Sequence, residues 1–263
     1  MTHTRAFLRH ARSVHPPELK AEALRLVGLG VNDCEISRRI GIPRRTIMDW
    51  RQPTYVRKAP TQACPRCGEA MKPMHFSVDD YAELFAMYLG DGCISPLERT
   101  YRLRIFLDSR YPDIIEECRA LLERTFPRNR VDVVSFKGGR YLSVHHAHLP
   151  CLIPQHGAGK KHRRAITPEL WQWALIASAP WRFIKGCIRT DGCSFINQTG
   201  RYAYLSYGFS NLSDDIARVL TFALDHAGVE YRHTNGCCRR TNNIRVNRRA
   251  SVALMHEHVG VKS

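Results

Sequence analysis

Asp91 and Asp191 are the residues whose setting most clearly predicts chemistry, because each ends a copy of one short motif. The first copy reads Leu84-Phe-Ala-Met-Tyr-Leu-Gly-Asp-Gly92 and the second reads Ile184-Lys-Gly-Cys-Ile-Arg-Thr-Asp-Gly192. Both are typical of the last turns of an apolar helix, and we expect the final glycine of each to end the helix in a left-handed conformation. A carboxylate at the negative end of a helix dipole is disfavoured by roughly 0.3–1 kcal/mol. A divalent cation would relieve that penalty.

The small residues of the two motifs are spaced alike. Ala86 and Gly90 are four positions apart in the first copy, as are Gly186 and Thr190 in the second. Residues four apart share one face of a helix, and small residues there allow another helix backbone to approach closely. We therefore expect the two helices to pack face to face, which would bring both aspartates together at one end.

The repeat extends beyond the motifs. A helical pattern at 112–122 recurs at 213–224, and His156-Gly-Ala-Gly-Lys160 recurs as His258-Val-Gly-Val-Lys262. Asp-Gly alone is a common turn dipeptide, so a single copy would also fit an ordinary turn. An internal repeat with one helix-terminal acid in each copy instead favours a paired site.

The paired motifs resemble those of the single-chain LAGLIDADG homing endonucleases, and the resemblance covers roughly Ser77 to Ser263. It implies an α+β fold of two pseudo-symmetric αββαββα halves, residues 77–166 and 167–263. In that family the motif helices form the interface, and two antiparallel sheets form a saddle over double-stranded DNA. The resemblance also implies a monomer with internal pseudo-two-fold symmetry.

The resemblance further implies which residues form the site. The last acid of each motif is the family's metal ligand, so Asp91 and Asp191 are expected to bind Mg²⁺ or Mn²⁺. The backbone carbonyls of Gly90 and Thr190 would help to hold the ions. We expect two repeated basic residues near the scissile phosphates, where they would stabilise charge or polarise water: Lys160 and Lys262.

Two functions follow from this resemblance. The leading hypothesis is a site-specific, metal-dependent double-strand DNA endonuclease of the LAGLIDADG homing type. The alternative is a catalytically inactive transcription regulator of the same fold, because degenerate relatives include bacterial regulators that bind DNA without cutting it. The acid that often precedes the catalytic one by two positions is here Leu89 in one copy and Arg189 in the other. The sequence identifies neither the target site nor whether the chain is encoded in an intron, in an intein or on its own.

The charge of the chain points to a polyanionic partner. The formal net charge is +16 and the sequence pI is about 9.7, which fits nucleic acid. Residues 1–78 hold 14 Lys/Arg against 6 Asp/Glu, a net of +8, and the other 185 residues hold 26 against 18, also +8. The N-terminal third is therefore the more basic part per residue. An RNA-binding zinc ribbon would explain the charge but not the duplicated acids.

Residues 1–59 are predicted to form a small all-α helix-turn-helix domain with a linker. Asn32 or Asp33 can cap a second helix, and Gly41 makes a tight turn before a third helix at 44–51. In such domains the third helix places its N-terminal residues in the major groove. The alternative is a basic surface helix with no reading role. The residues expected to contact DNA are Arg44, Arg45, Thr46, Asp49 and Arg51.

Residues 60–76 form a second linker that carries Cys64-Pro-Arg-Cys-Gly68. This turn is typical of a zinc knuckle, in which Cys64 and Cys67 would be two of the four ligands that tetrahedral zinc needs. The sequence has no second Cys-x-x-Cys. The alternatives are a redox pair or two free thiols. The candidates for the missing ligands are His75, which is nearest, and the more distant Cys151, His156 and His162.

A histidine cluster at His145, His146 and His148 invites interpretation as a metal site or a nuclease motif. We interpret these residues instead as surface histidines at the end of a strand.

Alternating patterns predict strands with a basic or polar outer face in both halves. In the run Tyr101–Leu107, for example, Arg102 and Arg104 share one face while apolar residues share the other. Arg and Asn are the side chains that read guanine and adenine in the major groove. The alternative for each strand is an ordinary solvated face. The residues expected to contact DNA from the two halves are Arg102, Arg104, Lys137, Arg140, Tyr204, Arg232, Asn243, Arg245 and Asn247.

The composition also predicts the compartment. Ten cysteines in a chain whose N-terminus lacks the apolar core of a secretion signal are expected to be reduced thiols or metal ligands. No apolar run approaches the ~18 residues that a membrane span needs. We therefore expect a soluble, cytoplasmic protein that associates with DNA and not with a membrane.

Overall fold

The computed structural model describes residues 15–51, 62–64, 66–68, 70–71, 77–235 and 241–262. The chain divides into two compact units, Met1–Ala59 and Pro60–Ser263. Among the helices of these described stretches, none has both the length and the apolar character needed to cross a bilayer. The linker expected at the end of residues 1–59 and the candidate ligand His75 lie outside the described residues.

Residues 15–51 of the first unit contain three helices: α1 (Pro17–Gly28), α2 (Asp33–Ile40) and α3 (Arg44–Arg51). The Asn32 side chain caps α2 by accepting a hydrogen bond from the Glu35 amide at 3.0 Å. Gly41 ends the same helix at a φ of 70°, a conformation that glycine adopts without strain. A small core of buried apolar residues holds the three helices together: Ala23, Leu26, Ile36, Ile42 and Ile47.

The second unit has a mixed α+β fold that repeats one order of elements twice, as expected. A pair of antiparallel strands of two residues each, β1 (Gln62–Ala63) and β2 (Ala70–Met71), precedes the repeat. The first half contains α4 (Val78–Asp91), β3 (Gly92–Pro96), β4 (Tyr101–Asp108), α5 (Pro112–Thr125), β5 (Asp132–Phe136), β6 (Gly139–His146) and α6 (Leu149–Leu152). The second half contains α8 (Pro180–Arg189), β7 (Gly192–Thr199), β8 (Tyr202–Asn211), α9 (Asp214–His226), β9 (Arg232–Asn235), β10 (Asn242–Val246) and α10 (Arg249–His258). A 3-10 turn (Lys161–Arg163) and α7 (Leu170–Ser178) connect them.

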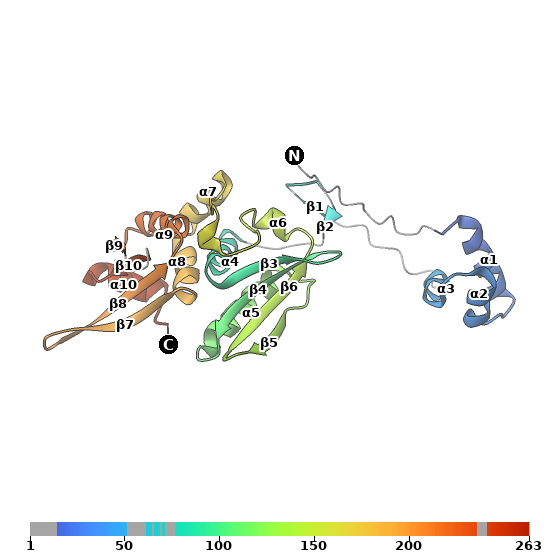
Figure 1. Cartoon of the computed structure of the whole chain (residues 1–263), viewed down its shortest axis with the longest axis horizontal. Coiled ribbons are helices and arrows are strands. Elements are labelled where there is room, and N and C mark those ends of the chain that lie inside the picture. The colour runs from blue at the N-terminus through green and yellow to red at the C-terminus, as the bar shows by residue number, and fades with distance from the viewer. Residues whose placement is uncertain are drawn as a thin grey trace. The chain divides into compact units, whose positions relative to one another are not determined.

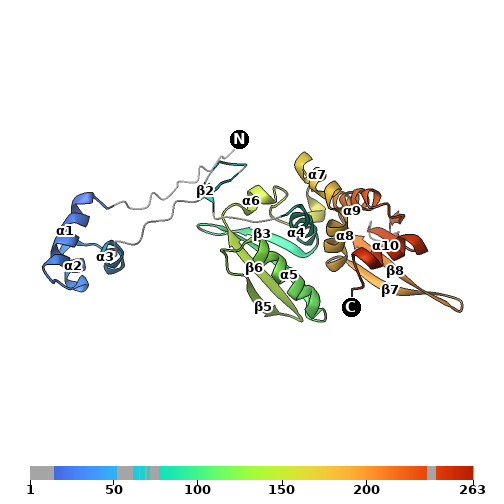
Figure 2. The same ribbon diagram turned by 180° about the vertical axis from the view of Figure 1, so that it is seen from behind.

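The two halves share one sheet topology. The strand orders are β3-β4-β6-β5 and β7-β8-β10-β9, and all neighbouring strands are antiparallel. In both sheets the first strand begins with a motif glycine, and Gly92 faces Ile105 as Gly192 faces Phe209. The sheets lie on opposite sides of the central α4–α8 pair (Figure 1, Figure 2).

The motif helices α4 and α8 pack closely through their small residues, which confirms the expected helix pair. A Cβ atom built on Gly90 would lie 2.2 Å from Thr190 Oγ1, and one built on Gly186 would lie 2.7 Å from Ala86 Cβ. These separations are too short for any side chain, so the backbones meet as closely as the glycines permit. Every residue of α4 from Tyr81 to Leu89 is buried.

The expected reason for the motif glycines is wrong. Gly92 has a φ of −88° and an extended backbone, and Gly192 is absent from the positive-φ glycines. A Cβ on Gly92 would instead lie 2.5 Å from Tyr88 Cα, and one on Gly192 would lie 2.6 Å from Ile188 Cα. Each glycine is therefore required because the chain turns sharply from helix to strand and passes over the preceding helical turn.

Ion pairs join α8 to the first half beside this helix contact. The buried Glu83 carboxylate lies 3.4 Å from the Arg182 guanidinium and 3.9 Å from the Lys185 ammonium. Lys185 and Arg189 also reach Glu117 of α5, at 3.2 and 3.3 Å. Burial raises the pKa of Glu83, and the two cations oppose that rise. The pairing thus keeps a buried acid compatible with the tight interface.

Candidate active site

The two motif aspartates lie together where α4 and α8 end. Asp91 is the last residue of α4, and Asp191 follows Thr190, which caps α8. Because Gly90 meets Thr190 across the helix pair, the residues that follow them leave the interface side by side. The charge of Asp191 is one of the causes that raise the pKa of Asp91, which places the two carboxylates within electrostatic reach of each other.

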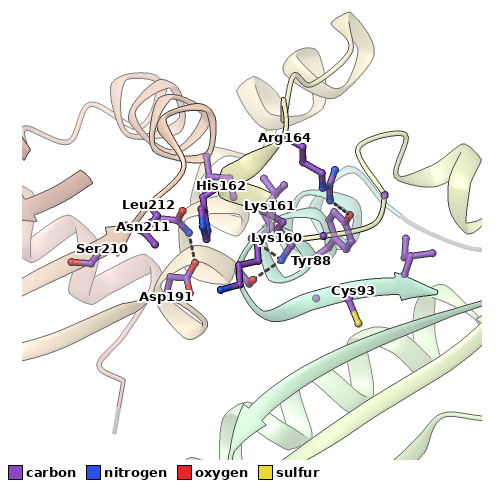
Figure 3. A pocket seen from close by; sticks show the side chains of 17 residues that line it. Tyr88, Cys93, Lys160, Lys161, His162, Arg164, Asp191, Ser210, Asn211 and Leu212 are labelled. Atoms are coloured by element: carbon purple, nitrogen blue, oxygen red, sulfur yellow. Dashed lines mark hydrogen bonds between the residues drawn. The ribbon is translucent and has the colours of Figure 1, made fainter. Parts of the chain in front are cut away.

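The two carboxylates have different surroundings. Desolvation, followed by the charge of Asp191, raises the pKa of Asp91 to about 6, although Lys161 and Lys262 oppose the rise. Desolvation also raises the pKa of Asp191, but a hydrogen bond from Asn211 and the same two lysines counteract it. Asn211 Nδ2 donates to Asp191 Oδ2 at 2.6 Å (Figure 3). Asp191 is therefore the better stabilised anion of the pair.

A lysine from each half reaches the end of its motif helix. Lys262 Nζ donates to the carbonyl oxygens of Thr190 at 2.7 Å and Gly192 at 2.9 Å. In the first half Lys161 Nζ donates to the carbonyl oxygens of Leu89 at 2.9 Å and Gly90 at 2.5 Å. Both ammonium groups also lie over aromatic rings.

Lys161, and not the expected Lys160, thus occupies the position that mirrors Lys262. Lys160 is exposed one residue earlier, in the loop that precedes the 3-10 turn. The repeat of His-Gly-Ala-Gly-Lys and His-Val-Gly-Val-Lys aligned Lys160 with Lys262, but the lysine that reaches the end of α4 is the next residue, Lys161. Desolvation lowers the pKa of Lys161 to about 8, against the opposing charges of Asp191 and Asp91.

A cavity of about 440 Å³ opens beside Asp191. Figure 3 shows Asn211 and Ser210 on the side of the second half, and Lys161 and Tyr88 on the side of the first. Residues of both halves and of the loop between them therefore line the same cavity. The polar residues that line it are Tyr88, Lys160, Lys161, His162, Arg164, Asp191, Ser210 and Asn211.

The donor set at this place fits a hard divalent cation. It consists of oxygen atoms only, namely two carboxylates and the main-chain carbonyls at the helix ends, which are the ligands that Mg²⁺ prefers in proteins. The carbonyls of Gly90 and Thr190 already accept hydrogen bonds from ammonium groups, so they point toward positive charge. The pKa of Asp91 is raised first by desolvation and then by the charge of Asp191, and a bound cation would oppose both effects.

The outer face of the second sheet carries Tyr204, Arg232, Asn243 and Arg245, which are expected to contact DNA. The strand pairing sets Asn243 opposite Ser210 and Arg245 opposite both Gly208 and Arg232. Tyr204 lies on the same face of β8 as Gly208, because alternate residues of a strand share a face. Tyr204, Arg232 and Arg245 are exposed, and Asn247 is exposed just beyond β10.

The first sheet presents Arg102 and Arg104 from neighbouring positions of β4. Arg104 lies across from Cys93 and Ser143, and its guanidinium stacks over the Tyr141 ring at 5.7 Å. Among the described residues, no acceptor pairs with the buried Nε atom of either arginine. Both side chains are half-buried and alternate along β4 with the buried Leu103 and Ile105.

Arg140 does not share that face. It lies across from Leu107 of β4 and Ser135 of β5, and Leu107 belongs to the buried face. Arg140 is exposed only because it stands at the end of β6. Lys137 lies in the turn between β5 and β6 with a φ of 41°. The register therefore sets Arg140 on the other side of the sheet from Arg102 and Arg104.

In the first unit the predicted contact residues lie along α3. Arg44, Arg45, Asp49 and Arg51 are exposed, and Thr46 is half-buried. Arg45 pairs with Asp49 at 3.4 Å, and Arg51 pairs with Asp33 of α2 at 2.8 Å. Within residues 15–51, Arg44 has no ion-pair partner.

Cys64 and Cys67 meet two residues of the first half. His148 and Cys151 lie beside them, and the four ligand atoms are all within 4.8 Å of one another. Burial would raise the pKa of Cys64, but hydrogen bonds, led by those from the amides of Cys67 and Arg66, lower it to about 7. The interpretation of the histidine cluster as surface residues is wrong for His146 and His148, which are 3% and 5% exposed.

Comparisons with known proteins find similar structures but no sequence family. No protein-family model matches the chain, and no curated protein matches it. The homing endonuclease I-DmoI, solved with DNA and Mn, is 14% identical with a TM-score of 0.49, and the match covers 69% of this chain and 97% of that one.

The second similar protein is DUF199/WhiA. The full-length protein from Thermatoga maritima is 13% identical with a TM-score of 0.47, and the match covers 72% of this chain and 57% of that one. Its N-terminal LAGLIDADG domain is 14% identical with a TM-score of 0.45, at 72% and 86% coverage. None of these structures assigns an activity to this chain.

Proposed function

We propose that this chain is a site-specific, divalent-metal-dependent endonuclease that cuts both strands of DNA and acts as a monomer. The observation that carries the proposal is the pair Asp91 and Asp191 at the touching ends of α4 and α8, each accompanied by a lysine from its own half. Two sites related by an internal repeat suit a duplex, which has one scissile phosphate on each strand.

The aspartates would hold Mg²⁺ or Mn²⁺, together with the carbonyls of Gly90 and Thr190. A bound cation of this kind makes water a better nucleophile and stabilises the charge of the scissile phosphate. Lys161 and Lys262 keep positive charge beside the carboxylates, where an ammonium group can donate a hydrogen bond to a phosphate oxygen. The polar outer faces of the two sheets would bind the duplex and set its position over the site.

The test is cleavage of a plasmid library by the wild type and by Asp91→Asn, Asp191→Asn and the double variant. Asparagine keeps the size of aspartate and loses the charge that a hard cation needs. We expect each single variant to lose double-strand cleavage and to keep binding of the selected site in a gel shift. Asp225→Asn, an exposed acid at the end of α9, should cut like the wild type.

Two outcomes would contradict the proposal. Cleavage that survives in the double variant would exclude these aspartates as the metal ligands. A wild type that binds its best site with high affinity but cuts it with neither Mg²⁺ nor Mn²⁺ would instead support a regulator of the same fold.

The helices of the first unit would add DNA affinity through α3. Binding through phosphate contacts weakens with salt, and removing one such contact lowers the slope of log K against log salt by about 1. Arg44→Ala/Arg45→Ala should therefore flatten the slope. Arg38→Ala/Arg39→Ala is the matched control, because these α2 arginines are paired with Glu35 at 2.7 and 3.0 Å. Equal slopes for the two double variants would contradict a role for α3.

A further inference from the structure

We propose that Cys64, Cys67, His148 and Cys151 bind one structural zinc ion, which fastens the segment before α4 to the first half. The four residues come from two places far apart in the sequence, and Cys67 and His148 are 81 positions apart. Each place supplies a pair with the same spacing, Cys64-Pro-Arg-Cys67 and His148-Leu-Pro-Cys151. This site is separate from the paired aspartates and does not depend on nuclease activity.

The distances between the ligand atoms fit a tetrahedron around zinc. With Zn–S bonds of 2.3 Å and Zn–N bonds near 2.0 Å, the ligand atoms of a tetrahedral site lie about 3.5–3.8 Å apart. His148 Nδ1 lies 3.4 Å from Cys67 Sγ and 3.9 Å from Cys151 Sγ. All four atoms lie within 4.8 Å of one another. A contraction of the longer separations would bring all four atoms to the distances of a tetrahedral shell.

The local backbone presents both pairs as turns. The Gly68 amide donates to the Cys64 carbonyl at 2.8 Å, and Gly68 has a φ of 69°, so the chain folds back just after Cys67. On the other side, the Cys151 amide donates to the His148 carbonyl at 3.0 Å at the start of α6. Each turn brings two ligands three positions apart to the same side.

The chemistry of the four ligands points to zinc in a structural role. Three thiolates and an imidazole form a soft, closed set that suits zinc, and hard cations such as Mg²⁺ prefer oxygen. With four protein ligands the ion has no open position for water or substrate. Two of the four ligands are shielded from solvent, since Cys64 is 3% exposed and His148 is 5% exposed.

A second contact shows that the same segment rests on the body of the unit. Arg66, between the two cysteines, forms a two-pronged ion pair with Glu169, and its Nη2 donates to Glu169 Oε1 at 2.8 Å. Its guanidinium also lies 5.9 Å from the centre of the Trp171 ring. Arg66 thus holds the turn at Cys64–Gly68 against the start of α7, and zinc would hold the same turn against α6.

Metal content is the first test. Protein purified under reducing conditions without chelator should contain about one zinc per chain by elemental analysis. Cys67→Ser, His148→Ala and Cys151→Ser should each reduce that content severalfold. Cys34→Ser and Cys93→Ser, which change exposed cysteines outside the cluster, should leave it unchanged.

Thiol reactivity tests the site in the wild type, where no variant can misfold. Cys67 is exposed, so it should be alkylated as fast as Cys34 unless a metal holds its sulfur. We expect Cys67 to react many times more slowly than Cys34 until a chelator is added, and then to react at a similar rate. Mass spectrometry of the digested protein reports each cysteine separately.

Three results would overturn the proposal. The first is a Cys67 that reacts as fast as Cys34 before chelation, in protein without zinc. The second is a zinc content that is unchanged in both His148→Ala and Cys151→Ser. The third is a disulfide between cluster cysteines in protein kept under reducing conditions. Loss of Mg²⁺-dependent cleavage would contradict only the proposed nuclease, since neither zinc content nor thiol reactivity depends on it.

Discussion

Asn211 donates a hydrogen bond to Asp191 at 2.6 Å, and the first half has no counterpart of this contact. Ile105 and Phe209 occupy equivalent positions opposite the motif glycines, so the residue equivalent to Asn211 is Leu107. Leucine cannot donate a hydrogen bond, and Leu107 is buried. The two carboxylates of the site are therefore unequal. The hydrogen bond from Asn211 opposes the rise in the pKa of Asp191, whereas no described residue donates such a bond to Asp91, whose pKa is raised to about 6.

This inequality predicts an unequal effect on the two DNA strands. Asn211→Leu should raise the pKa of Asp191 and weaken cation binding in one half only. Plasmid cleavage should then stop at the nicked circle, which would accumulate several-fold relative to the wild type before linear product forms. Because Asn211 also accepts from the Ser213 amide at 2.7 Å, the melting temperature must be measured alongside. Unchanged ratios of nicked to linear DNA in a folded variant would rule out this role.

The raised pKa of Asp91 predicts an unusual dependence of stability on pH. A carboxyl group with a pKa of about 6 in the folded state and 3.8 as its ordinary value favours folding when protonated. Its contribution is therefore present at pH below 4 and is lost as the pH rises toward 6. Asp91→Asn should therefore stabilise the metal-free protein at pH 7.5. We expect the gain to be no more than about 1 kcal/mol, because solvent screens the charge of the partly exposed Asp91 carboxylate.

Thermal melts at pH 4 and pH 7.5, without and with Mg²⁺, would check this prediction. The advantage of Asp91→Asn should disappear at pH 4. Added Mg²⁺ should raise the melting temperature of the wild type more than that of the variant, since binding to the folded state stabilises it. A variant that is less stable than the wild type at pH 7.5 without metal would contradict the destabilising effect predicted for the Asp91 charge.

Two adjacent lysines offer a matched comparison. Lys161 reaches the carbonyls at the end of α4, whereas Lys160 is exposed. Lys161→Met and Lys262→Met should each lower the cleavage rate by at least tenfold, because each removes a positive charge beside the carboxylates. Lys160→Met removes the same formal charge and should change only the salt dependence of binding. Equal losses for Lys160→Met and Lys161→Met in single-turnover cleavage would remove the distinction.

The closeness of α4 and α8 predicts that even one methyl group is costly there. Gly186→Ala would place a Cβ 2.8 Å from the Glu83 carbonyl oxygen, and overpacking of this kind costs typically about 1–3 kcal/mol. Gly157→Ala is the control, because its nearest contact would be an ordinary 3.6 Å to Arg164. Chemical denaturation should therefore separate the two variants. Similar midpoints would mean that the helix pair can adjust.

The repeated motifs, the order of elements and the small-residue face were predictable from the sequence. These features are local or periodic, since burial follows the period of a helix or strand, and a repeat shows itself by alignment. The pairing of Gly90 with Thr190 follows from two such faces meeting. Alternation likewise predicted that Arg232, Asn243 and Arg245 share a face.

The tertiary structure decided what depends on the path of a loop or on register. Whether Lys160 or Lys161 reaches the end of α4 depends on the path of the loop at 156–161, and no periodic pattern encodes that path. Register set Arg140 on the face opposite Arg104. The sequence predicted that the motif glycines are needed at the helix ends. Only the folded turn shows the reason, which is that a side chain there would clash with the backbone of the preceding helical turn.

The sequence by itself determined the kinds of groups available, and the tertiary structure decided which of them meet. Cys64 and Cys67 were recognisable as half of a candidate zinc site, and Cys151 was one of the distant candidates for the other half. His148, which lies beside them in the fold, was not among those candidates. Asn211 carried no signal at all before β8 brought it to Asp191. The physical reason is that spacing along a chain constrains neighbours within one element, whereas contacts between elements depend on how their buried faces pack.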